Sequence, residues 1–118
     1  MAFQVEELAY QLIAALRVVV PRIKGRDRAL ADQLTRAASS VALNIAESNY
    51  SDPGNRRARL FTAAGSANET RAALRVAVEW GYCAAVQAEG AQALLERIIP
   101  MLWKLTRGFR IETMGGGK

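Results

Sequence analysis

Two carboxylates lie among apolar residues in the middle of the chain, and they are the first candidates for chemistry. Glu47 belongs to the stretch QLTRAASSVALNIAES at 33–48, and Glu69 belongs to FTAAGSANET at 61–70. A pair of carboxylates can serve as general acid and general base. Because neither acid has a nucleophile or a metal ligand near it in the sequence, we expect a protein that is not an enzyme and has no catalytic residue.

The residue types that are missing exclude several classes of site. The 118 residues include no histidine and a single cysteine, Cys83. Histidine-dependent catalytic triads and metal sites built from histidines or from several thiolates are therefore excluded. The glycines form no phosphate-binding loop of the GxxxxGK[ST] type. We expect no metal and no cofactor.

The single cysteine and the first residues bear on location. Cys83 has no second cysteine with which to form an intrachain disulfide, which fits a reducing compartment. The opening MAFQVEELAY carries two glutamates where a signal peptide has positive charge. No window approaches the roughly 18 apolar residues of a membrane span. We therefore expect a cytoplasmic protein with no membrane partner.

Polar residues also recur at helical spacing beside an apolar stripe. If the segments on either side of Ser51 and Asp52 form a helical hairpin, Arg36 falls opposite Ala67, within a turn of Ser66 and Glu69. The same register places Asn44 and Glu47 opposite a cluster of arginines at 56–59. We call this group the polar seam; its residues are Gln33, Arg36, Ser40, Asn44, Glu47, Ser66 and Glu69.

The polar seam has two interpretations. Half-buried polar groups need partners, so these residues are expected to form hydrogen bonds and ion pairs between the two helices. Alternatively, some of them line a ligand cleft or a subunit interface, because satisfied polar networks also specify association. The sequence leaves both interpretations open.

Apolar residues at steps of three and four predict helices along almost the whole chain. The first pattern stops at Pro21, and residues 21–28 then form a connection with Asp27 as the N-cap of a second helix that begins near Arg28. The two predicted apolar stripes are Val5, Leu8, Leu12, Leu16 and Val19, then Leu30, Leu34, Ala37, Val41 and Ile45.

Two more helices follow. Asp52 is expected to cap a third helix over 53–80, with Gly81 as a left-handed C-terminal cap. The fourth helix starts after Cys83 and is expected to kink at Pro100. The predicted stripes are Leu60, Ala63, Ala67, Leu74 and Ala77, then Ala91, Leu94, Ile98, Leu102, Leu105 and Phe109.

Short connections between four helices favour antiparallel neighbours. We therefore predict an all-α fold, an antiparallel up-and-down four-helix bundle. It forms a single domain over residues 1–112, and residues 113–118 are expected to form a flexible glycine-rich tail.

The charge balance permits a polyanionic partner. Sixteen basic and eleven acidic side chains give a net charge of +5, which attracts RNA, DNA or an acidic protein. Aromatic residues that could stack on bases are few and mostly at core-like positions, so single-strand recognition by stacking is not expected. Alternatively, the arginines are solvated or paired internally, and the protein is an assembly module. The candidate surface is Arg56, Arg57, Arg59, Arg71 and Arg75.

The two polar stretches resemble a known family. QLTRAASSVALNIAES is similar to the Q-[IL]-x-R-A-x-x-S-[IV]-x-x-N-I-A-E-G signature of the small bacterial four helix bundle proteins known as 23S ribosomal RNA intervening-sequence proteins. FTAAGSANET resembles their next segment through Phe61, Gly65, Ser66 and Glu69. Ser48 departs from the family's glycine, and the usual tryptophan near the start of the first helix is absent.

The resemblance implies more than the residues show by themselves. It implies a four-helix bundle that assembles as a homopentamer and acts near nucleic acid. Relatives in diversity-generating retroelements bind a reverse transcriptase and its RNA. The family's recurring polar residues coincide with the polar seam, which fits a shared structural network as well as a shared binding site.

Overall fold

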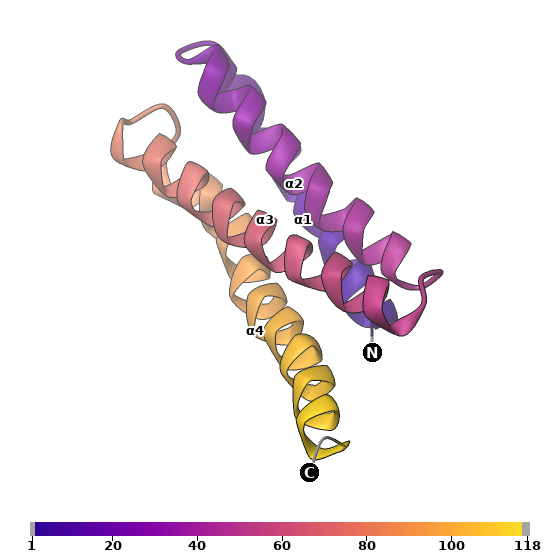
Figure 1. Cartoon of the computed structure of the whole chain (residues 1–118). Coiled ribbons are helices and arrows are strands. Elements are labelled where there is room, and N and C mark those ends of the chain that lie inside the picture. The colour runs from indigo at the N-terminus through magenta and orange to yellow at the C-terminus, as the bar shows by residue number, and fades with distance from the viewer. Residues whose placement is uncertain (1, 117–118) are drawn as a thin grey trace.

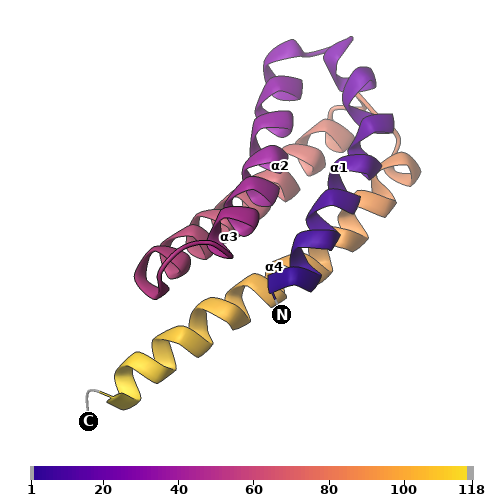
Figure 2. The same cartoon turned by 90° about the vertical axis from the view of Figure 1, so that its right-hand side faces the viewer.

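Four helices make up the fold, as the apolar spacing predicts. The computed structural model describes the backbone of residues 2–116 and the side chains of residues 4–107. The helices are α1 (Ala2–Lys24), α2 (Arg28–Ser48), α3 (Pro53–Glu79) and α4 (Ala85–Gly116). Figure 1 and Figure 2 show consecutive helices running in opposite directions, and α1 packs against both α2 and α4, as α3 does. The predicted four-helix bundle is confirmed.

Aspartates begin α2 and α3 where the sequence predicts caps. Asp27 Oδ1 accepts a hydrogen bond from the Leu30 amide at 3.0 Å, and Asp52 Oδ1 accepts one from the Asn55 amide at 3.0 Å. Pro53 occupies the first turn of α3, where its missing N–H costs nothing. The hydrogen bonds from Asn55 hold the pKa of Asp52 below its ordinary value.

The end of α1 differs from the prediction. The helix does not stop at Pro21 but continues to Lys24. Ile23 extends the apolar stripe by one more step of four and is fully buried, and that burial offsets the one backbone hydrogen bond that a proline removes. The Pro21 carbonyl still accepts a hydrogen bond from the Gly25 amide, at 3.2 Å.

The predicted apolar stripes form the core. Every predicted stripe residue of α1 and α3 is buried, and so is every one of α2 except Leu30, which is partly buried. On α4, Leu95 is buried in preference to its neighbour Leu94, which packs only partly against the core. The side chain of Phe109 lies outside the described residues.

The last helix is the longest. In both views its C-terminal part projects past the other three helices (Figure 1, Figure 2). The predicted tail begins at Thr113, but α4 runs to Gly116, and residues 117–118 lie outside the described part of the chain. The boundary between the bundle and its tail stays a prediction. Over the residues described, none of the helices has an apolar stretch of the length that a bilayer requires.

A left-handed glycine ends α3. Gly81 has φ of 77°, and two hydrogen bonds around it define a Schellman turn. The Tyr82 amide donates to the Ala77 carbonyl, and the Gly81 amide donates to the Val78 carbonyl, both at 2.9 Å. The predicted C-terminal cap is confirmed, and it brings Trp80 and Tyr82 to the same end of the bundle.

Replacing this glycine should destabilise the protein. We predict that Gly81→Ala lowers the free energy of unfolding by about 1–2 kcal/mol, because a side chain is strained at positive φ. The matched control is Gly90→Ala: Gly90 lies within α4 with open space around its Cα, so this change should raise stability by about 0.5–1 kcal/mol. Urea denaturation measures both, and equal effects of the two changes would contradict the cap assignment.

Candidate functional site

Three contacts join α2 to α3 along the polar seam. The hydroxyl groups of Ser40 and Ser66 are hydrogen bonded at 2.7 Å. At one end of the seam Glu47 Oε2 lies 3.7 Å from Arg59 Nη2. At the other end Gln33 Nε2 donates to Glu69 Oε2 at 3.5 Å. The polar seam therefore connects the two helices over several turns.

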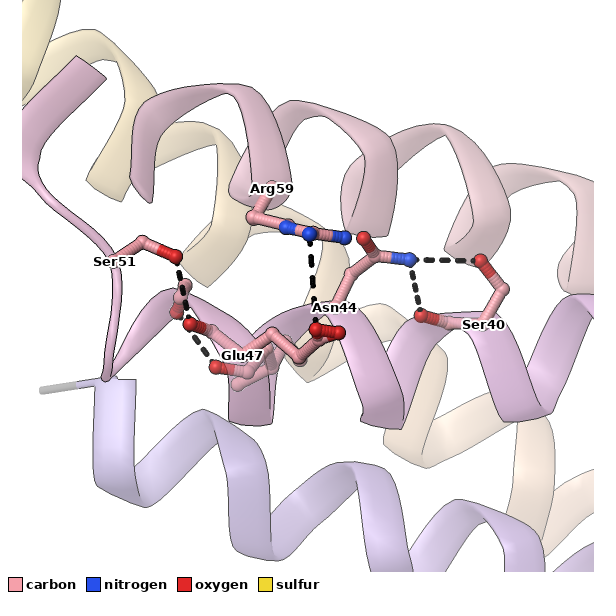
Figure 3. Close-up of polar contacts among 7 residues, drawn as sticks. Ser40, Asn44, Glu47, Ser51 and Arg59 are labelled. Carbon is pink, nitrogen blue, oxygen red and sulfur yellow. Dashed lines mark hydrogen bonds and ion pairs between the residues drawn. The ribbon is translucent and has the colours of Figure 1, made fainter. Parts of the chain in front are cut away.

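Asn44 does not reach the arginines at the start of α3. Its Nδ2 donates instead to the carbonyl and the hydroxyl of Ser40, at 2.9 and 3.1 Å. Figure 3 shows this side chain turned along α2, while Arg59 points from α3 towards Glu47. Asn44 lines the same groove as Arg59, in keeping with the hairpin register, but its amide donates to acceptors one turn away on its own helix.

Arg36 is the one member of the polar seam that makes no hydrogen bond or ion pair with the described residues. Its side chain is exposed and lines an open groove of about 410 Å³ between α2 and α3, together with Thr35, Ser39, Ser40, Leu43, Asn44, Glu47 and Arg59. The polar seam thus combines contacts between helices with an open groove, and both interpretations of it stay open.

A second groove lies on the other side of α2, against α1. It measures about 330 Å³, and most of the surface that lines it is apolar, although Arg17 also lines it. Thr35 and Ser39 line both grooves, so the outer face of α2 separates a polar groove from an apolar one. The apolar lining is Ile13, Leu16, Val20, Pro21 and Ala38.

The five candidate arginines of α3 point in different directions. Arg59 approaches Glu47 of α2, whereas the guanidinium of Arg57 lies over the ring of Phe61, 4.7 Å from its centroid. That ring in turn contacts Trp103 of α4 edge-on, with centroids 5.8 Å apart. Arg57 therefore belongs to the α3–α4 side of the bundle, and Arg59 belongs to the α2 side.

Arg71 and Arg75 are exposed, and Arg56 is partly buried. Arg75 Nε lies 2.7 Å from Glu79 Oε2, and Arg71 donates to the side-chain oxygen of Asn68 at 2.9 Å. Arg56 makes no side-chain contact of this kind with the described residues. The five arginines are therefore spread along α3 rather than gathered in a single cluster, and we call them the α3 row.

The aromatic residues do not all lie at core-like positions. Trp80 is 68% exposed and Tyr50 is 93% exposed. Trp80 stacks on Tyr82, with ring centroids 6.3 Å apart and planes inclined by 15°. These two rings are exceptions to the expectation that most aromatics lie at core-like positions. The available signal was the string WGY around the predicted glycine cap, since a helix-end residue need not follow the apolar stripe.

The candidate chemical groups are set apart from one another. Glu47 and Glu69 are both exposed and contact different partners. Burial raises the pKa of the Cys83 thiol, an effect that the positive charge of Arg22 partly offsets. Within the described residues no three acidic or cysteine side chains gather as a metal site would require. The absence of catalysis stays a prediction.

Comparison with known proteins places the chain in a structural context. A family model described as "23S rRNA-intervening sequence protein" matches residues 3–104. A crystal structure of a protein with unknown function from the S23 ribosomal protein family of Bacteroides thetaiotaomicron is similar in fold, with a TM-score of 0.76 and 20% identity, over 86% of this chain and 97% of that one. A search of curated proteins finds no match.

The serine contact at the centre of the polar seam should stabilise the bundle measurably. We predict a coupling of about 0.5–1.5 kcal/mol in a double-mutant cycle of Ser40→Ala and Ser66→Ala, because each hydroxyl satisfies the other at a half-buried position. Urea denaturation of the four proteins provides the measurement.

The matched control is the cycle of Glu47→Gln and Arg59→Gln. This ion pair is long and exposed, so its coupling should stay below about 0.5 kcal/mol and vanish in high salt. A larger coupling energy for the ion pair than for the serines would show that the polar seam depends on charge. That result would contradict the prediction that the serine contact contributes more.

Proposed function

Since the chain belongs to the 23S rRNA-intervening sequence protein family, we propose that it is a non-enzymatic cytoplasmic bundle that assembles as a homo-oligomer and binds nucleic acid through a basic surface. The oligomer is a homopentamer in this proposal, as the family resemblance implies. The partner is RNA or DNA, and the contact is made chiefly with the phosphate backbone.

The observation that carries the proposal is the charge of α3. The helix α3 (Pro53–Glu79) contains five arginines and two acids, Glu69 and Glu79. The ion pairs that Arg59 and Arg75 make are exposed on both sides, so each contributes little free energy and leaves the guanidinium free to exchange a carboxylate for a phosphate. Counterion release then favours a polyanion at low salt.

Assembly is supported by the apolar surface. The α1–α2 groove presents apolar side chains to solvent, and Leu43 on the adjoining face of α2 is 64% exposed. Burying such surface against a second copy removes it from water. Because neither Arg71 nor Arg75 lines either groove, an interface there would leave those arginines accessible.

An assembly module that binds no nucleic acid is the alternative. Its support is that Arg59, Arg71 and Arg75 already have partners within the chain. In that case the arginines serve stability and solubility, and the partner is another protein. Charge variants then leave assembly and partner binding unchanged.

Binding of a duplex at increasing salt tests the proposal. We expect the triple variant Arg56→Gln, Arg71→Gln, Arg75→Gln to bind duplex RNA or DNA more weakly. The slope of log K against log salt should become shallower by up to about 0.9 for each phosphate that the variant no longer neutralises. Fluorescence anisotropy with a labelled duplex is the measurement.

A second triple variant controls for net charge. Arg97, Lys104 and Arg107 are exposed on α4, and changing all three to Gln removes the same charge from another surface. This variant should keep most of the affinity and slope of the unmodified protein. Binding that is absent at low salt, or indifferent to salt, would contradict the proposed function. Equal reductions in both variants would contradict the assignment to α3.

A further inference from the structure

An exposed tryptophan lies at the end of the bundle that carries the α1–α2 and α3–α4 connections, which we call the loop end. Trp80 is the last residue before the left-handed Gly81, and Tyr82 is the first after it. The Schellman turn folds the two residues together, so their rings stack nearly parallel. This turn needs the glycine for its backbone geometry, but it does not need an indole.

Tyr82 anchors the stack to the bundle. Its ring packs partly against the hydrophobic core, and the Arg26 guanidinium carbon lies 5.5 Å from its centroid. Arg26 comes from the connection between α1 and α2, so two loops meet at this end, as Figure 1 and Figure 2 show. Trp80 rests on this support and still remains 68% exposed.

The same end carries a concentration of positive charge. Arg22, Lys24, Arg26 and Arg28 fall within seven residues, with Asp27 the one acid among them. The carboxylate of Asp27 is occupied in capping α2. Arg22 is close enough to the α3–α4 loop to lower the pKa of Cys83 against the effect of burial. Near Trp80, Glu79 is paired with Arg75.

An exposed aromatic ring stacked on an anchored tyrosine, at the end of the bundle that carries these four basic residues, fits one class of ligand. We propose that Trp80 stacks on an unpaired base of a single-stranded nucleic acid whose phosphates contact Arg22, Lys24, Arg26 and Arg28. Stacking on aromatic side chains combined with a positive path for the backbone is the usual mode of single-strand binding. A duplex keeps its bases stacked on each other and offers Trp80 no free face.

This inference rests on the proposed function, since both require a polyanion, but it assigns a different set of residues and a different strand type. The α3 row binds phosphates of any nucleic acid. The loop end distinguishes single strands from duplexes through one ring. Removing the indole of Trp80 should therefore weaken single-strand binding alone. Removing the arginines of the α3 row should weaken binding of both single strands and duplexes.

Anisotropy with labelled 12-nucleotide oligomers tests the inference. The probes are oligo(U), oligo(dT), an abasic oligomer of the same length, and a duplex. We expect the unmodified protein to bind oligo(U) or oligo(dT) about tenfold more tightly than the abasic oligomer, and Trp80→Leu to bind the single strands about tenfold more weakly. Affinity for the duplex should not change. The RNA and DNA probes show which backbone the site prefers.

Two further variants keep the result interpretable. Trp80→Phe should retain part of the single-strand affinity, because it keeps an aromatic face. Tyr50→Leu is the matched control: Tyr50 is 93% exposed in the connection between α2 and α3, at the opposite end of the bundle, and its replacement should change nothing. Circular dichroism establishes that each variant is folded.

The remaining outcomes separate this inference from the proposed function. Undiminished single-strand binding by Trp80→Leu, or equal affinity for the abasic oligomer, overturns the stacking site while salt-dependent duplex binding still supports the proposed function. A lower particle mass of Trp80→Leu overturns it too, because Trp80 is then a subunit contact. Binding to none of the probes overturns both.

Discussion

The close approach of α2 and α3 is the constraint on which the rest of the surface depends. Alanines at Ala37, Ala63 and Ala67 are buried, and such small side chains let two helices approach closely. The 2.7 Å bond between Ser40 and Ser66 requires that approach. Once α2 is fixed against α3, its outer face necessarily separates the polar groove from the apolar groove, and the two grooves share Thr35 and Ser39. Helix packing thus determines which polar groups meet each other and which face solvent.

Most of the fold could be predicted because its signals are local. The spacing of leucines, valines and alanines identifies the buried face of each helix, and Asp27, Asp52 and Gly81 mark helix ends through hydrogen bonds and backbone preference. The predicted end of α1 at Pro21 was wrong, because a proline near a helix end lowers the stability of the helix but does not end it when a buried residue follows. Ile23 is that residue, and its contribution comes from packing that a local rule does not include.

The polar seam and the surface were harder to predict. The hairpin register placed Arg36 within a turn of Ser66 and Glu69, whereas Ser66 bonds to Ser40 and Glu69 accepts from Gln33. The register left several partners within reach of each long side chain. Asn44 bonds within its own helix, Gln33 reaches Glu69, and Arg36 remains in the groove. Periodicity says even less about residues at helix ends. Trp80 follows the last turn of α3, so only the turn geometry shows that it is exposed and stacked on Tyr82.

These features describe a bundle with an apolar groove, a polar groove and a row of arginines on α3. The proposed assembly would bury the apolar groove between copies of the chain. Sedimentation equilibrium of the unmodified chain, over a range of protein concentrations and at low and high salt, tests this most directly. Burial of apolar surface predicts an assembly that persists in high salt, because apolar contacts are not screened. The proposed homopentamer predicts a particle of five times the 12.8 kDa chain mass. A particle of one chain mass at every concentration would contradict it.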